Sequence, residues 1–174
     1  EEFSLDPIEN YRFPDPKQLV RVDELRQRIA FLKAHYPGHA IGARAINSFG
    51  LFEQTCHLIG HENTFMSIAL CPQVVHRMAE RIKEFFLAIY EIYLGECGRD
   101  VDLIELSGDD YAGTFMSMVS AETYVEFYMR HYQEIIQRIK ALAPNAKVMF
   151  HSDGNIMKFV QHWIDSGADA IHSC

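Results

Sequence analysis

The sequence lacks the features of a membrane-spanning, nucleic-acid-binding or disulfide-stabilised protein. No apolar run approaches the ~20 residues of a membrane span. Lys and Arg number 16 against 24 Asp and Glu, for a net charge of −8, which excludes the clustered basic face that phosphate binding needs. The four cysteines, Cys56, Cys71, Cys97 and Cys174, match no zinc-ribbon or Cys-x-x-Cys spacing. We therefore expect free thiols in a cytoplasmic protein with no nucleic-acid or membrane partner.

The length and composition are those of one globular domain. The 174 residues are 48% hydrophobic and 23% charged, which allows a sizeable core. The chain begins without Met in a polar stretch and stops at Cys174, directly after a strand-like segment. We expect residues 1–174 to be a single domain, the central fragment of a larger fold with both ends truncated.

Hydrophobic periodicity predicts helices that alternate with short strands. Residues 1–20 contain Pro7, Pro14 and Pro16, which predicts an irregular lead-in. Apolar residues at helical spacing predict helices over 22–36, 72–95, 121–142 and 156–164, with one or two short helices between 49 and 70. Strands are predicted over 39–46, 101–106, 147–151 and 168–172.

Strand–helix alternation predicts an α/β fold with parallel strands, each beside its predecessor. Two architectures fit, an open doubly wound sheet or a slice of a (β/α)₈ barrel, and both place ligands at the carboxyl ends of the strands. Four strands cannot close a barrel. The outer edges of the first and last strands would favour association, including with a second copy of the chain.

Polar residues follow three of the predicted strands. They form the segments Gly108-Asp109-Asp110-Tyr111, His151-Ser152-Asp153-Gly154-Asn155 and His172-Ser173-Cys174. Asp and Asn beside Gly also form turns, and Asp153 or Asn155 could cap the next helix. Because the carboxyl ends of parallel strands meet at one edge of the sheet, their convergence there favours a functional site.

Strand parity predicts which side chains face inward. If His151 points inward, so does Lys147, and Glu105 takes the same face on the preceding strand. A buried Glu needs a partner, so Glu105 could pair with His151 or, equally well, with Lys147. His151 and Asp153 could bind Zn²⁺ with an open position for substrate, or they could form a general acid/base pair.

Several segments together resemble the uroporphyrinogen decarboxylase superfamily, in order and in spacing, over most of the chain. They are Phe13-Pro14-Asp15-Pro16, Gly50-Leu51-Phe52-Glu53 with Gly60-His61-Glu62-Asn63, Gly108-Asp109-Asp110 with Ser120, and His151-Ser152-Asp153-Gly154-Asn155 with Gly167-Ala168-Asp169. The resemblance implies a (β/α)₈ TIM barrel of about twice this length, of which this chain would supply about four strands.

The resemblance implies one of two chemistries. Decarboxylases of the superfamily remove acetate carboxyl groups from uroporphyrinogen without a cofactor. Related methyltransferases move a methyl group between a small substrate, or coenzyme M, and a corrinoid protein, and their His-x-Cys-Gly-Asn segment supplies two zinc ligands. Here His151 matches the His, whereas Asp153 stands where the Cys would be.

The Asp at this position indicates a harder metal site than a thiolate would give. Such a site suits a methyl group carried on oxygen or nitrogen, as in a methoxy or methylamine compound. The leading interpretation is a zinc-dependent methyltransferase that passes a methyl group from a small substrate to a corrinoid protein. His151 and Asp153 would hold the metal, Glu105 would be a third group, and Asp109 and Asp110 would orient substrate or accept a proton. The alternatives are a metal-free uroporphyrinogen decarboxylase and a non-catalytic barrel that docks a corrinoid protein.

Overall fold

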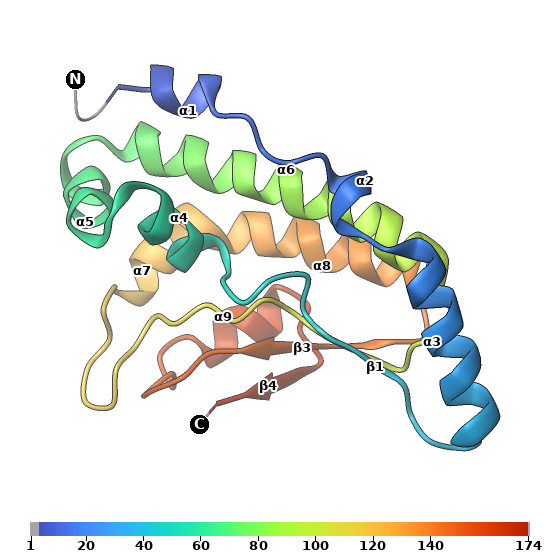
Figure 1. Ribbon diagram of the computed structural model, residues 1–174. Coiled ribbons are helices and arrows are strands. Elements are labelled where there is room, and N and C mark those ends of the chain that lie inside the picture. The colour runs from blue at the N-terminus through green and yellow to red at the C-terminus, as the bar shows by residue number, and fades with distance from the viewer. Residues whose placement is uncertain (1–3, 174) are drawn as a thin grey trace.

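Four parallel strands form a single sheet in the order β1-β2-β3-β4. Figure 1 shows β3 and β4 side by side. The computed structural model describes residues 4–173. The strands are β1 (Gly42–Ala43), β2 (Leu103–Glu105), β3 (Lys147–His151) and β4 (Ala170–His172). In the register of the sheet, Leu103 pairs with Gly42 and Lys147, and His151 pairs with His172. The sequence-based prediction of parallel, sequentially adjacent strands is confirmed.

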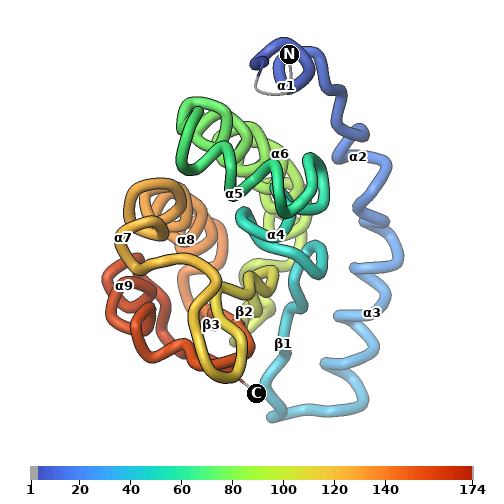
Figure 2. Tube along the Cα trace, turned by 90° about the vertical axis from the view of Figure 1, so that its left-hand side faces the viewer, coloured from blue at the N-terminus to red at the C-terminus, as the bar shows by residue number. Residues whose placement is uncertain are grey.

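The main helices lie outside the strands, as in part of a (β/α)₈ barrel. They are α3 (Val22–His35), α4 (Leu51–Ile59), α5 (His61–Leu70), α6 (Pro72–Cys97), α7 (Ala121–Tyr124), the π-helical segment η1 (Val125–Met129), α8 (Arg130–Leu142) and α9 (Val160–Asp165). Figure 2 shows α3, α6, α8 and α9 in an arc around the strands. Among the helices of residues 4–173, none combines the length and apolar content that a bilayer crossing requires.

The two faces of the sheet differ as strand parity predicts. Ile104 on β2 and Val148 and Phe150 on β3 are fully buried under the helices. The alternate residues Glu105 and His151 are half-buried on the opposite face. The apolar face therefore packs against the helices, while the face that carries the polar side chains is turned toward the inside of the barrel.

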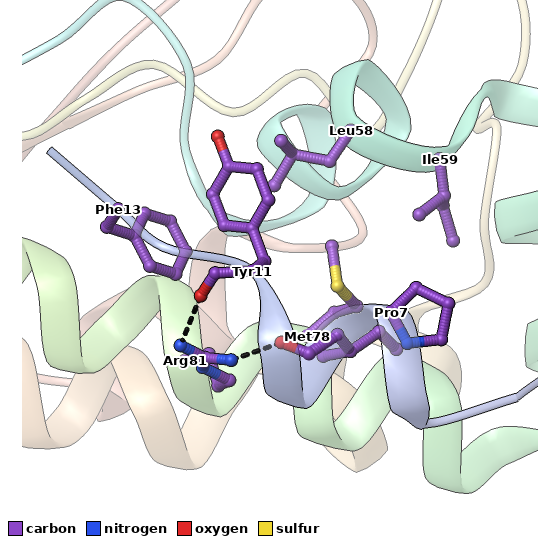
Figure 3. Close-up of a pocket in the computed structure, with 8 residues that line it drawn as sticks. Pro7, Tyr11, Phe13, Leu58, Ile59, Met78 and Arg81 are labelled. Carbon is purple, nitrogen blue, oxygen red and sulfur yellow. Dashed lines mark hydrogen bonds between the residues drawn. The ribbon is translucent and has the colours of Figure 1, made fainter.

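The lead-in is more ordered than its prolines predict. It forms two short helices, α1 (Asp6–Asn10) and α2 (Pro16–Leu19), so the expectation of an irregular segment is wrong. Both helices have Pro in the first turn, where the missing N–H costs no hydrogen bond. Arg81 of α6 holds the segment by donating hydrogen bonds to the main-chain carbonyls of Ile8, Glu9 and Tyr11. Figure 3 shows the bond to Tyr11. These are contacts between distant parts of the chain, which local sequence patterns do not reveal.

Several other elements differ from their predicted bounds, among them β2 and β4, which are shorter than the strands predicted over 101–106 and 168–172. The strand expected over 39–46 is two residues long, although parallel pairing resumes between Phe49 and Gly108. The helix expected over 121–142 contains the π-helical segment η1, after a first turn that Ser120 caps by accepting the Thr123 N–H at 3.1 Å. Helix α9 begins at Val160, four residues later than Ile156. From residue 22 onward the order of elements is as predicted.

Candidate functional site

The carboxyl ends of β2 and β3 bring Asp110, His151 and Asp153 together, and we call these residues the strand-end trio. Each offers one ligand atom, and these atoms lie within 4.8 Å of one another. The Asp153 N–H donates to Asp110 Oδ1 at 2.7 Å, which ties the loop after β2 to the loop after β3. His151 Nε2 lies 3.7 Å from Asp153 Oδ1. All three residues are half-buried, so the trio is both fixed and accessible.

The His151 ring is held from two sides. Its Nδ1 lies 2.9 Å from Nδ1 of His172, the register partner of His151 on β4. Its edge rests on Gly108, where a Cβ would lie 2.7 Å from Cδ2 of His151. A glycine is therefore required beside the ring. With Nδ1 engaged by His172, Nε2 is the ring nitrogen nearer to Asp153. Cys174, which ends the third polar segment, lies outside the described residues.

Asp109 lies apart from the trio, although its neighbour Asp110 belongs to it. Asp109 is fully buried, and its carboxylate accepts the N–H groups of Phe52 at 3.0 Å and Glu53 at 2.9 Å. It also accepts the hydroxyl groups of Tyr111 at 2.5 Å and Tyr132 at 2.7 Å. Burial raises the pKa of Asp109, and the four donors oppose that rise. Asp110 therefore lies with His151 and Asp153, whereas Asp109 is buried apart from them and holds the start of α4.

Glu53 is a site residue that the sequence interpretation missed. It lies in the first turn of α4, and its Oε2 accepts the N–H of Asp110 at 3.2 Å. Burial, together with the nearby carboxylates of Asp109, Asp110 and Asp153, raises the pKa of Glu53 to about 7. A carboxyl group in this environment can hold and transfer a proton near neutral pH. Only the resemblance drew attention to the Gly50–Glu53 stretch, because no spacing rule links a helix residue to a distant strand end.

Glu105 has a partner other than the two expected from parity. It forms an ion pair with Arg44 at 3.4 Å, whereas Lys147 pairs with Asp169 at 3.6 Å. Glu105 nevertheless shares a cavity of about 470 Å³ with His151. The cavity is lined by Arg44, Ala45, Asn47, Ser48, Glu105, Gly108 and His151. Its volume is in the range of small-molecule sites, and its walls carry both signs of charge.

A second cavity, of about 140 Å³, lies away from the strand ends (Figure 3). It is enclosed by the lead-in, the end of α4 and the outer side of α6. Its walls are Pro7, Ile8, Tyr11, Phe13, Leu58, Ile59, Met78 and Arg81. Apart from Arg81, which is bonded to the lead-in, these side chains are mostly apolar, so this cavity offers no reactive group.

The donor set of the trio fits a zinc ion. One imidazole and two carboxylates are ordinary zinc ligands, with bond lengths of about 2.0–2.2 Å, so two ligand atoms of one ion are at most about 4.4 Å apart. The ligand atoms of the trio lie within 4.8 Å of one another, so a small side-chain rotation would bring them to the distances that one zinc ion requires. Three protein donors would leave a coordination position for substrate.

A comparison with protein-family models identifies the family of the chain. The family model described as uroporphyrinogen decarboxylase (URO-D) matches residues 2–173. A search of curated proteins found no match. The family match covers nearly the whole chain, and the parallel sheet with its outer helices agrees with part of the family's barrel. The chain therefore belongs to the uroporphyrinogen decarboxylase family.

Proposed function

We propose that this chain carries the metal-binding strand ends of a methyltransferase, which moves a methyl group from a small substrate to a corrinoid protein. The observation that carries the proposal is the strand-end trio, in which Asp110, His151 and Asp153 place their ligand atoms within 4.8 Å of one another. The decarboxylases that the sequence resembles work without a cofactor and have no need of such a donor set. By the resemblance noted from the sequence, His151 also stands where the methyltransferases have a zinc-binding histidine.

Each residue of the trio has a role in this proposal. His151 and Asp153 hold the metal, and Asp110 is the third donor because its carboxylate already lies against the Asp153 loop. Bound zinc would supply Lewis acidity that polarises the oxygen or nitrogen carrying the methyl group. Asp109 keeps α4 in place, and through it Glu53 beside Asp110.

The cavity beside His151 is the proposed substrate site. Its ion pair between Arg44 and Glu105 gives it polar walls that suit a small methoxy or methylamine compound. Glu105 would orient the substrate and is not a metal ligand here. The corrinoid protein would approach at the same end of the sheet, where the trio is accessible. Cys56, Cys71 and Cys97 are free thiols, which supports a cytoplasmic location.

Metal analysis of the full-length protein with a His151→Ala variant tests the proposal. We expect the wild type to hold about one zinc ion per chain. His151→Ala should lose the metal and methyl transfer together and keep its fold, since His151 lies at a strand end outside the apolar core. The matched control is His39→Ala, an exposed histidine before β1 at the opposite end of the sheet.

Two results would replace this function with another. A metal-free full-length protein that decarboxylates uroporphyrinogen would be a decarboxylase. A protein that binds a corrinoid protein without any turnover would be a non-catalytic docking barrel. An Asp153→Cys variant adds a positive test, because it should still bind zinc while the softer ligand shifts the methyl-carrier preference toward thiols.

A further inference from the structure

We propose that His172 is a positioning residue for the candidate metal centre. It accepts a hydrogen bond from Nδ1–H of His151 and so keeps Nε2 of His151 available to the metal. This inference rests on the metal site of the proposed function and adds a residue that the family resemblance does not assign.

The sheet places the two rings against each other. His151 ends β3 and His172 ends β4, and the two residues are register partners in neighbouring parallel strands. Their side chains therefore leave the sheet on the same face. The Nδ1 atoms are 2.9 Å apart, and the ring centroids are 5.0 Å apart with an angle of 30° between the planes. At this distance one nitrogen carries the proton and the other accepts it.

The chemistry of imidazole decides which nitrogen must donate when a metal is bound. A neutral ring has one N–H, so a histidine that binds a cation through Nε2 carries its proton on Nδ1. That N–H needs an acceptor, and the atom at hydrogen-bond distance is Nδ1 of His172. His172 then keeps its own proton on Nε2. Outer partners of this kind fix the orientation of a ligating histidine and raise its basicity.

The geometry favours a positioning role for His172 over direct ligation. His172 meets His151 at Nδ1, whereas Nε2 of the same ring is the atom nearest Asp153, at 3.7 Å. The backbone of Gly108 lies against one edge of the His151 ring, which limits rotation of the side chain. His172 thus contacts the ring nitrogen that does not face the trio.

Zinc affinity of the full-length protein, measured by competition with a chelator, tests the inference. His172→Leu removes the acceptor and should weaken zinc binding by ~10–100-fold. His172→Asn should bind zinc almost as well as the wild type, because Asn Oδ1 can take the place of His Nδ1 as the acceptor. Since His172 is exposed, neither change disturbs the core. His39→Leu is the matched control and should leave zinc affinity unchanged.

Nitrogen-15 NMR of the zinc-loaded protein reports the hydrogen bond itself. We expect a proton on Nδ1 of His151 and none on Nδ1 of His172. A protonated Nδ1 on His172, a wild-type zinc affinity in His172→Leu, or equal losses in the Leu and Asn variants would each overturn the inference.

Failure of the inference can be told apart from failure of the proposed function. Methyl transfer together with an unchanged affinity in His172→Leu rejects the inference alone. The expected affinity pattern without methyl transfer rejects the methyltransferase and supports the role of His172. A full-length protein that binds no zinc rejects both.

Discussion

Asp109 shows how a single buried charge can organise a site that it does not enter. Its carboxylate accepts two main-chain N–H groups at the start of α4 and two tyrosine hydroxyls, and it meets no hydrogen-bond acceptor among these partners. Four donors suit an ionised carboxylate, which is an acceptor at both oxygens. The first free N–H groups of a helix also favour a negative charge. Asp109 therefore links the end of β2 to α4.

An Asp109→Asn variant should lose stability because an amide cannot match this environment. Its NH₂ group would face donors, and a buried donor without an acceptor costs about 1–3 kcal/mol, in addition to the lost charge-assisted bonds. We expect the free energy of unfolding to fall by about 2–3 kcal/mol in urea titrations of the full-length protein. Asp165→Asn, at an exposed position on α9, is the control and should change stability little. Equal effects of the two substitutions would contradict this account.

His131 is a buried histidine in the first turn of α8. Burial, helped by the positive charges of Lys83 and Arg130, lowers the pKa of His131 from its usual 6.5 to about 4. Glu134 and Glu80 act in the opposite direction, and the value of about 4 already includes their effect. The folded protein therefore keeps His131 neutral at pH values where the unfolded chain protonates it.

The direction in which stability changes with pH follows from the number of protons that each state binds. Between pH 6.5 and about 4 the unfolded state binds more protons at His131, so stability falls as the pH falls through this window. His131→Phe keeps a ring and removes the titration. Its free energy of unfolding should depend less steeply on pH, by up to about 1.4 kcal/mol per pH unit. The free energy of unfolding of both proteins is measured by urea titration at several pH values. If it changes equally with pH in wild type and variant, His131 does not contribute to the pH dependence of stability.

At the scale of elements, the placement of α4 depends on a glycine. Gly50 precedes the helix, and a Cβ at this position would overlap the Tyr132 hydroxyl and the Asp109 side chain. Its φ of −79° is open to any residue, so close approach and not backbone conformation requires glycine. Figure 1 shows α4 between the strand ends and the long helices, where a displacement would also move Glu53.

Gly50→Ala and Gly95→Ala should therefore have opposite effects. Overpacking at Gly50 should lower the free energy of unfolding by about 1–3 kcal/mol. Gly95 lies in α6, where a Cβ would meet no neighbouring atom within 4 Å, so Ala should raise stability by about 0.5–1 kcal/mol. Thermal unfolding of both full-length variants measures the contrast. A stabilising Gly50→Ala would show that α4 can move away without cost.

Sequence patterns predicted the elements that apolar periodicity defines. The bounds of β3 are as predicted, and Val148 and Phe150 are buried as parity requires. Periodicity could not show that Arg81 orders the lead-in, because that depends on a hydrogen bond to a residue 70 positions away in the chain. It also could not show the π-helical segment η1, whose apolar spacing remains close to that of an α-helix.

The candidate site was predictable where it lies on strands and not where it lies on helices. His151 and Asp153 follow β3 directly, and Asp110 follows the neighbouring strand, so topology brings them together. Asp109 and Asp110 are adjacent in sequence, yet one is buried under α4 and the other joins the trio. Which of two adjacent residues turns inward after a strand ends depends on the partners that the helices supply.

At the scale of the whole molecule, the sheet is one sector of a barrel wall. On its helix-covered face Ile104, Val148 and Phe150 are fully buried, and its inner face carries Glu105 and His151 beside the polar cavity. Within residues 4–173, β1 pairs with β2 and β4 pairs with β3, so one edge of each outer strand has no strand beside it. Unpaired N–H and C=O groups at such edges are templates for pairing with another chain.

The 174-residue chain, expressed by itself, should consequently associate through these edges. We expect its mean mass in sedimentation experiments to rise with concentration. Ala170→Lys places a charge on the edge strand β4, where Ala170 is exposed, and should shift the population toward monomer. Ala34→Lys adds the same charge at an exposed position of α3 and should have no effect, which separates edge pairing from a general gain in solubility. Circular dichroism of all three proteins checks that the folds match. A wild-type chain that stays monomeric over a wide concentration range would mean that its own segments protect the β1 and β4 edges.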